Sequence, residues 1–289
     1  MLWQLLIGFL LAALFGGLAM RLGALSGSGV VGATLIGGLT YGLGGPVWAV
    51  ILIAFFVSSS ALSFWRRERK AALAARLAKG SRRDLAQTLA NGGVAALCAG
   101  LAGIVSADSR WYAIGLLGFL GALSAATADT WATELGVLAT RPPRLITTGQ
   151  PVPPGTSGAV SAQGFAASLA GGAFIGLAAF LLFSLVPTGL AAHRAWLWLF
   201  SPLCAVAGLV GAAFDSLLGA TWQALYRCDV CAEFTERTQH TCGHPTRLVR
   251  GLRWLDNDAV NLAATLVGAI TLAGSFTALE LSLTLLQQP

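Results

Sequence analysis

Charged residues are scarce in this sequence. Asp, Glu, Lys and Arg make up 10% of its 289 residues, whereas a soluble domain usually carries about 25%. Hydrophobic residues make up 56%, and the mean hydropathy is +0.73. A soluble fold of this length would lack the polar residues that its surface needs, so lipid must be part of the solvent. The 36 glycines fit a membrane protein, because small residues let membrane helices pack closely.

Three familiar signatures are also missing. Met1–Met20 has no basic n-region, and apolar character continues far beyond it, which argues against a secretory signal peptide. No GK[ST] sequence is present, which excludes a Walker A phosphate loop. No HExxH is present, which argues against a membrane zinc protease of that type.

Long apolar runs predict an all-α fold, a polytopic transmembrane bundle of seven or eight spans that forms a single membrane domain over residues 1–289. Val30–Phe64 is too long for one crossing of about 20 residues. Gly37–Pro46 (GGLTYGLGGP) interrupts it, so we expect two tightly connected segments, one of them short or re-entrant. The other expected spans are Leu2–Met20, Leu85–Val105, Trp111–Ala139, Ser161–Val186, Ala195–Leu225 and Asn257 to about Leu285. The side of the N-terminus stays open.

Basic residues gather in two connecting segments. Eight of the 18 Lys and Arg lie in Arg66–Arg83, and five more lie between Arg227 and Arg253. Because basic loops stay cytoplasmic, loops 65–84 and 226–255 should face the cytoplasm of a cell whose plasma membrane holds the chain. AALAARLAK in the first loop favours an amphipathic surface helix. Juxtamembrane loops account for these charges without nucleic acid, and they can hold anionic lipid or nucleotide phosphate.

Several acidic and amide side chains lie within the predicted spans. Asp129 and Glu134 are five residues apart, about 140° around a helix, and form one polar sector. Asp215 lies in GAAFDSLLGA. The remaining groups are Asn257, Asp258 and Asn261 at the start of the last span, and the stripe Asp84, Gln87 and Asn91. A carboxylate at the centre of a membrane helix costs about 2.5–3.5 kcal/mol, so such residues usually face a cavity, a metal or a partner.

Two interpretations of these groups are open. Amides such as Gln87 often only link membrane helices by hydrogen bonds. Three aspartates near the cytoplasmic ends of three spans instead suit Mg²⁺, which prefers oxygen ligands and serves phosphate chemistry. We therefore expect Asp129, Asp215, Asn257, Asp258 and Asn261 to bind Mg²⁺. The expected catalytic carboxylates are Asp129, Glu134, Asp215 and Asp258.

The loop 140–160 is rich in proline and glycine and cannot be a regular helix. Gly155–Gly158 can present successive backbone N–H groups with hydroxyls beside them, and Ser161 is a candidate N-cap for the next helix, whose N-terminus favours an anion. A bare glycine-rich loop is also common without a ligand. The residues expected to contact nucleotide or acceptor phosphate are Lys79, Arg83, Asn91, Thr147, Gly155, Thr156, Ser157, Gly158 and Ser161.

Cysteine and histidine cluster in the loop 226–255. Cys228 and Cys231 form a C-x2-C pair, and Cys242 with His244 can complete four zinc ligands. His240 could replace His244. A reducing cytoplasm disfavours disulfides, so the alternatives are structural zinc or a set of reduced thiols.

With these motifs assembled, the chain resembles the membrane family that includes the plant and cyanobacterial phytyl-phosphate kinases of tocopherol synthesis, and that also has an uncharacterised animal transmembrane branch. The resemblance runs from about Gly29 to Gly268. Ala159 stands where we expect a glycine in the loop, which weakens the argument for a backbone anion nest. The matching pieces are FFVSSSALS (Phe55–Ser63), RRDLAQTLANGG (Arg82–Gly93), ATADTWATELG (Ala126–Gly136), ITTGQPVPPGTSGAVSAQG (Ile146–Gly164), GAAFDSLLGA (Gly211–Ala220), the CDVC and CGH cluster, and LDNDAVN (Leu255–Asn261).

The resemblance implies a kinase that transfers phosphate from a nucleoside triphosphate to a prenyl monophosphate, giving the prenyl diphosphate. The partners would be the nucleotide, the prenyl phosphate and the bilayer, with Mg²⁺ as cofactor and zinc as a structural metal. The rival interpretation is a transporter or flippase for a lipid phosphate or an ion-coupled substrate, because glycine-broken segments and intramembrane carboxylates also mark transport sites. Polar clusters that adjoin cytoplasmic loops favour the kinase. Prenyl chain length, the nucleotide and the oligomeric state stay open.

Overall fold

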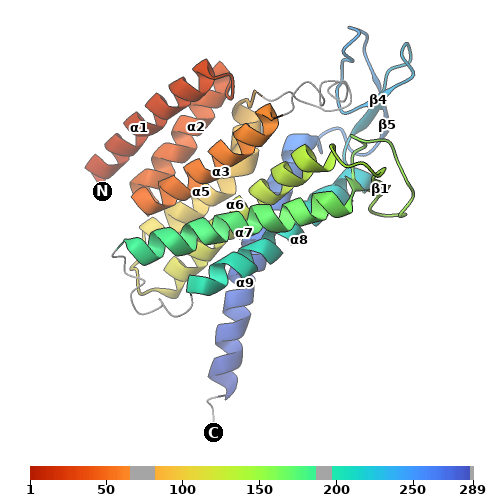
Figure 1. Cartoon of the computed structure of the whole chain (residues 1–289). Coiled ribbons are helices and arrows are strands. Elements are labelled where there is room, and N and C mark those ends of the chain that lie inside the picture. The colour runs from red at the N-terminus through yellow and green to blue at the C-terminus, as the bar shows by residue number, and fades with distance from the viewer. Residues whose placement is uncertain (66–81, 187–196, 287–289) are drawn as a thin grey trace.

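The molecule is a bundle of helices (Figure 1). The computed structural model describes residues 1–65, 82–186 and 197–286. The long helices are α1 (Leu2–Arg21), α3 (Pro46–Phe64), α5 (Leu85–Gly103), α6 (Arg110–Gly136), α7 (Ala162–Leu185), α8 (Phe200–Thr221) and α9 (Asn257–Leu286). Among the described residues, seven helices are long and apolar enough to cross a membrane, which confirms the predicted polytopic all-α fold. The predicted amphipathic helix and Lys79 lie outside the described residues.

The segment before α3 is broken, as the glycines predicted. Helix α2 (Gly27–Leu39) begins at the cap residue Ser26, whose hydroxyl accepts from the Gly29 amide, and runs into the π-helical turn η1 (Thr40–Gly44). Gly45 follows with φ +91°, a conformation that favours glycine, and Pro46 begins α3. The 13 residues of α2 span about 20 Å, short of the roughly 30 Å of a bilayer core.

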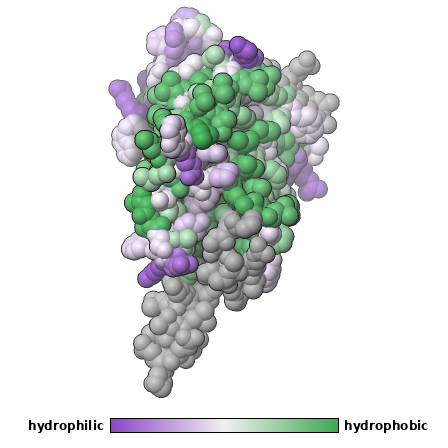
Figure 2. Space-filling model, turned by 90° about the vertical axis from the view of Figure 1, so that its left-hand side faces the viewer, coloured by the Kyte–Doolittle hydropathy of each residue, from purple (hydrophilic) through white to green (hydrophobic). Residues whose placement is uncertain are grey.

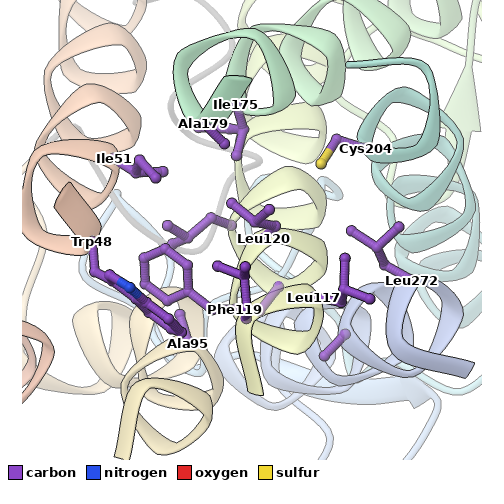
Figure 3. Packing of buried hydrophobic residues seen from close by; sticks show 14 of the residues in the cluster. Trp48, Ile51, Ala95, Leu117, Phe119, Leu120, Ile175, Ala179, Cys204 and Leu272 are labelled. Atoms are coloured by element: carbon purple, nitrogen blue, oxygen red, sulfur yellow. The ribbon is translucent and has the colours of Figure 1, made fainter. Parts of the chain in front are cut away.

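Helix α6 is the centre of the bundle, and it packs against α5, α7, α8 and α9. All residues from Gly115 to Ala128 are buried. Backbones approach closely at small residues: a Cβ on Gly121 would lie 2.3 Å from the Gly268 carbonyl oxygen of α9. Larger side chains fill the other flank, where the Trp48 and Phe119 rings lie 4.7 Å apart (Figure 3). This rigid centre fixes the ends of four neighbouring helices.

Apolar side chains cover much of the outside as well. Figure 2 shows hydrophobic residues over much of one face, with hydrophilic residues at its upper end and others along its sides and lower edge. Helix α1 is the most exposed of the described spans, with large side chains such as Leu10 and Leu14 more than half exposed. An apolar exterior of this kind is stable only against lipid.

Short strands gather at one end of the bundle, here called the loop end (Figure 1). Strands β1 (Arg144–Leu145) and β2 (Ala159–Val160) pair antiparallel within the loop between α6 and α7. The chain between α8 and α9 forms a three-stranded antiparallel sheet in the order β4-β3-β5, from β3 (Leu225–Arg227), β4 (Phe234–Thr235) and β5 (Arg247–Arg250). Only loops are expected from the sequence in both places, and the structure adds these strands.

Candidate active site

A polar cavity of about 160 Å³ opens at the loop end, between the ends of α6 and α8, the starts of α7 and α9, and the loop 140–160. We call it the acidic cavity, because three carboxylates line it. These are Asp129 on α6, Asp215 on α8 and Glu236, which directly follows β4. Asn257, the first residue of α9, completes this side. Four segments distant in sequence thus bring oxygen atoms to one place.

The three carboxylates interact electrostatically. Asp215 lies within the fields of Asp129 and Glu236, and Asp129 within that of Glu236. The Asp215 Oδ2 atom is buried and has no hydrogen-bond partner among the described residues. Like charges in a low dielectric repel, and an unsatisfied carboxylate oxygen is costly. The donor set, carboxylates with an amide oxygen, fits a hard divalent cation such as Mg²⁺.

The glycine-rich loop forms the opposite wall of the acidic cavity. Gly158 has φ +79°, and a Cβ there would lie 2.3 Å from the Ala220 backbone nitrogen, so only glycine fits. The Ser157 hydroxyl bonds the Gln223 side-chain oxygen at 2.8 Å, which ties the loop to the end of α8. The loop is therefore held close to Asp215 by backbone fit and by a side-chain hydrogen bond.

The loop is less open to an anion than the sequence suggested. The Thr156 amide donates to the Pro153 carbonyl, and the Ala159 amide donates to the Thr156 carbonyl. Ser161 is the N-cap of α7, as predicted, and its hydroxyl accepts from the Gly164 amide at 3.0 Å. All four residues from Gly155 to Gly158 line the cavity, and so does Ser161.

The remaining predicted residues lie elsewhere. Glu134 does not line the acidic cavity; its Oε1 atom accepts a 2.6 Å hydrogen bond from Ser63 on α3. The polar sector expected of Asp129 and Glu134 is therefore divided between two sides of α6. Asp258 and Asn261 follow Asn257 on α9 but are not among the residues lining this cavity. The three other predicted contacts are Thr147, which is exposed in its loop, and Arg83 and Asn91, which line a second cavity.

The Cys/His cluster holds four side chains together. The ligand atoms of Cys228, Cys231, His240 and Cys242 all lie within 4.8 Å of one another. The Cys228 and Cys242 sulfur atoms are 3.7 Å apart, and His240 Nδ1 is 3.1 Å from the Cys242 sulfur. A tetrahedral zinc with bonds of about 2.3 Å sets its sulfurs about 3.8 Å apart, so the geometry fits zinc.

The fourth ligand differs from the first choice made from the sequence. His240 is buried and takes the position that the sequence assigned to His244, as the alternative had allowed. His244 is exposed, with Nδ1 3.5 Å from the Cys242 sulfur. The other ring nitrogen of His240 lies 3.5 Å from Glu233, the carboxylate–histidine arrangement typical of metal ligands. The Cys231 amide lowers the pKa of the Cys228 thiol, which favours the thiolate that a metal binds.

Sequence reasoning missed two charged groups near the acidic cavity. Glu236 lies in the loop of the Cys/His cluster, outside every predicted span, and no sequence pattern pairs it with Asp215, which is 21 residues away; in the structure the two interact at the cavity. Arg250 on β5 donates to the Gly219 carbonyl oxygen at 2.6 Å. Burial lowers the Arg250 pKa, and the nearby Glu236 carboxylate opposes that change. The small sheet between α8 and α9 thus carries Glu236 to the cavity and places Arg250 within reach of its charge.

These features define a polytopic helical membrane protein with an acidic cavity at one end and a Cys/His unit beside it. Residues 10–269 match the family described as integral membrane protein DUF92, and the chain belongs to that family. The matched range contains every residue of the acidic cavity. The resemblance stated from the sequence motifs is confirmed at the level of this family.

Three relatives cover most of the chain. Protein PGR of Arabidopsis thaliana is 34% identical over 230 residues, 76% of this chain and 78% of the relative. An uncharacterized membrane protein of Methanocaldococcus jannaschii is 29% identical over 268 residues, 92% of each. Protein VTE6, chloroplastic, of A. thaliana is 24% identical over 246 residues, 85% of this chain and 63% of the relative. No solved structure matches the chain.

Proposed function

We propose that the chain is a membrane kinase that transfers a phosphate from a nucleoside triphosphate to a prenyl monophosphate. The observation that carries the proposal is the acidic cavity itself. Three carboxylates from separate elements meet there, and one of them holds a buried oxygen without a hydrogen-bond partner among the described residues. The similarity to Protein VTE6 and the motifs shared with phytyl-phosphate kinases support this activity over other phosphate chemistry.

In the proposed reaction, an oxygen of the prenyl phosphate attacks the terminal phosphorus of the nucleotide. The new phosphorus–oxygen bond forms as the bond to the bridging oxygen breaks, and the nucleoside diphosphate leaves with that electron pair. Mg²⁺ would neutralise phosphate charge in this step. Asp129, Asp215 and Glu236 would hold the ion, with the Asn257 side chain as a further oxygen ligand. The acceptor is already anionic, so positioning replaces a strong general base.

The loop end would face the cytoplasm, where nucleotide is available. Of the lysines and arginines that the structure describes, only Arg110, the first residue of α6, lies at the opposite end of the bundle. All the others lie at the loop-end termini of helices or in the segments that join them. The positive-inside rule then assigns the loop end to the cytoplasmic side of a cell membrane. The same charges attract an anionic nucleotide and an anionic lipid headgroup.

Zinc would serve a structural role beside this site. Cys228 and Cys231 lie in the turn between β3 and β4, and His240 and Cys242 lie between β4 and β5, so one ion would fix the fold of the three-stranded sheet. Glu236 follows β4 of that sheet and lines the acidic cavity. The proposed zinc therefore positions a proposed Mg²⁺ ligand.

The activity can be tested with purified protein in lipid nanodiscs. The measurement is the transfer of labelled phosphate from a nucleoside triphosphate to prenyl monophosphates. Asp215→Asn and Asp129→Asn should each lower turnover by about 10²–10³-fold, because each removes charge from the transition-state site. Glu236→Gln should raise the Mg²⁺ concentration for half-maximal rate by about 10-fold or more. Asp108→Asn, an exposed aspartate between α5 and α6, should leave turnover unchanged.

Two outcomes would contradict the kinase. Near-normal turnover in both aspartate variants would show that the acidic cavity is not the catalytic site. The second outcome is the absence of transfer with every nucleotide, together with translocation of a prenyl phosphate across the same bilayer. That pair of results would establish the transporter or flippase instead, which no described feature favours over the kinase.

A further inference from the structure

A second cavity, of about 270 Å³, lies between α1, α2, α3 and α5. We call it the apolar cavity, because most of its lining side chains are hydrophobic. It exists because of how the described helices pair: α1 packs on α2 and η1, whereas α3 packs on η1, α6 and α7. The contact between Phe15 of α1 and Phe56 of α3, with ring centroids 5.6 Å apart, bridges the gap at one place. Representative lining residues are Leu11, Phe15, Ala33, Ile36, Ala49 and Leu52.

The apolar cavity is long and reaches the lipid-facing surface. Its lining on α3 runs from Pro46 to Phe56, which is about 15 Å of helix. Leu11, Val50 and Ile53 line it and are also 49%, 45% and 38% exposed. In a membrane-spanning bundle, these exposed side chains face hydrocarbon. A lipid tail could therefore enter from the side without crossing water.

One end of the apolar cavity is polar. Arg83 lies there, at the loop end, with its guanidinium 5.5 Å and 5.3 Å from the ring centroids of Phe55 and Phe56. The Gln87 Oε1 atom is buried and finds no hydrogen-bond partner within the part of the chain that the structure describes. Burial lowers the Arg83 pKa to about 10, against the opposing effect of Glu134, so the group stays cationic at neutral pH. This end fits an anion that also offers a hydroxyl, such as a phosphate monoester.

The polar end also adjoins the acidic cavity. Arg83 is attracted to Glu134 on α6, and the next residue toward the N-terminus, Thr133, lines the acidic cavity. The two cavities therefore lie on either side of the last turns of α6. An amphiphile in the apolar cavity would have its headgroup at the border of the proposed phosphate site.

We propose that the apolar cavity binds the hydrocarbon tail of a single-chain isoprenoid monophosphate, with the phosphate against Arg83; this assignment rests on the proposed kinase function. Its volume lies below the roughly 300–1,000 Å³ of typical ligand pockets, which suits one short chain rather than the two chains of a bilayer lipid. The partly buried cation and the apolar walls match the two ends of such a molecule.

Photolabelling tests the binding site without any need for turnover. Farnesyl monophosphate with a diazirine on its tail should label α1, α2 and α3 of the nanodisc-held protein, and unlabelled farnesyl monophosphate should compete. Ala49→Leu, which fills the cavity, should lower this labelling by about 10-fold. Ala170→Leu, the same change at an exposed position on α7, should leave it unchanged.

Kinetics test the same assignment by chain length. Ala49→Leu should raise the KM for farnesyl monophosphate about 10-fold and leave that for dimethylallyl monophosphate, which barely enters the cavity, unchanged. Arg83→Gln should raise both KM values. Arg83→Lys keeps the positive charge but not the planar group stacked on the two rings, so its KM values should lie between those of the parent and of Arg83→Gln. Equal effects of Ala49→Leu on both acceptors would overturn the tail site.

The outcomes separate this proposal from the kinase. Phosphate transfer with labels confined to α7, α8 or α9 would overturn the tail site and leave the kinase standing. Labels in the apolar cavity without transfer by any nucleotide would overturn the kinase and support the tail site. Competition by phosphatidic acid as strong as that by farnesyl monophosphate would assign the cavity to bilayer lipid and overturn the proposal.

Discussion

The Ser63 hydroxyl donates a 2.6 Å hydrogen bond to the Glu134 carboxylate, joining the last turn of α3 to the last turns of α6. Glu134 also attracts Arg83 at the polar end of the apolar cavity. This carboxylate therefore connects three elements that enter the bundle at different points of the sequence. Its contacts with Ser63 and Arg83 fix the position of the apolar cavity relative to the end of α6, which lines the acidic cavity.

Ser63→Ala should destabilise the protein by about 1–2 kcal/mol, because a hydrogen bond to a charged, half-buried acceptor is lost. Ser58→Ala is the matched control on the same helix. Its hydroxyl donates to the Phe55 carbonyl within α3, so its removal should cost less than about 0.5 kcal/mol. Thermal unfolding in detergent, followed by tryptophan fluorescence, measures both. Equal melting temperatures for the two variants would contradict a structural role for the Ser63–Glu134 bond.

Gly158→Ala should abolish most activity, with at least a 10-fold loss of turnover. The φ of +79° strains any other residue, and the new Cβ would meet the Ala220 backbone, so the loop must move away from Asp215. Gly149→Ala separates the two effects, because Gly149 has φ +67° but nothing within 4 Å of a Cβ. It should keep activity within about twofold and lose about 1–2 kcal/mol of stability at most. Similar turnover for both alanine variants would show that loop position is unimportant.

One zinc per chain should be found by metal analysis of protein purified without chelator. His240→Ala should lose the metal and His244→Ala should keep it, because His240 is the histidine that groups with the three cysteines. Cys228→Ser should also lose it, whereas Cys98→Ser, a change in α5 outside the cluster, should not. Retention of zinc by His240→Ala and loss by His244→Ala would reverse the ligand assignment.

A cysteine at the loop end should react with a membrane-impermeant thiol reagent only from the cytoplasm. Thr148→Cys places the thiol on the exposed loop between β1 and β2, and Asp108→Cys places it at the opposite end, between α5 and α6. With Cys98 and Cys204 replaced, intact cells should label Asp108→Cys, and Thr148→Cys should be labelled only after permeabilisation. The parent background reports any labelling of the Cys/His cluster. Labelling of Thr148→Cys in intact cells would place the loop end outside and exclude a cytosolic nucleotide.

Local patterns in the sequence predicted the features that depend on few neighbours. Ser161 is the N-cap of α7, and the glycines around Gly45 break the chain before α3, because a cap or a turn needs only adjacent residues. Helix geometry also predicts the angle of about 140° between Asp129 and Glu134. It does not predict which neighbouring helix each of the two side chains faces. In the structure, Glu134 faces α3, where the Ser63 hydroxyl donates a hydrogen bond to it.

Tertiary contacts supplied what local patterns could not. Glu236 is brought near Asp129 and Asp215 by the pairing of β4 with β3. Strand β4 has only two residues, which is too short for a hydropathy pattern to predict its pairing. The choice between His240 and His244 also depended on the fold, because both stand two residues from Cys242 and fit the same spacing rule. The spacing therefore allows both histidines as the fourth ligand, and the fold of the loop places His240 beside the three cysteines.

The short helix α2 makes the protein sensitive to the thickness of its membrane. Its 13 residues and the η1 turn are shorter than the roughly 30 Å of hydrocarbon beside them, so the bilayer must thin locally or headgroups must dip toward Gly45. Ala33 and Ile36 of this same helix line the apolar cavity. Hydrophobic mismatch at α2 therefore acts directly on a wall of that cavity, and a thicker or sterol-rich bilayer would strain the entrance that a hydrocarbon chain must pass.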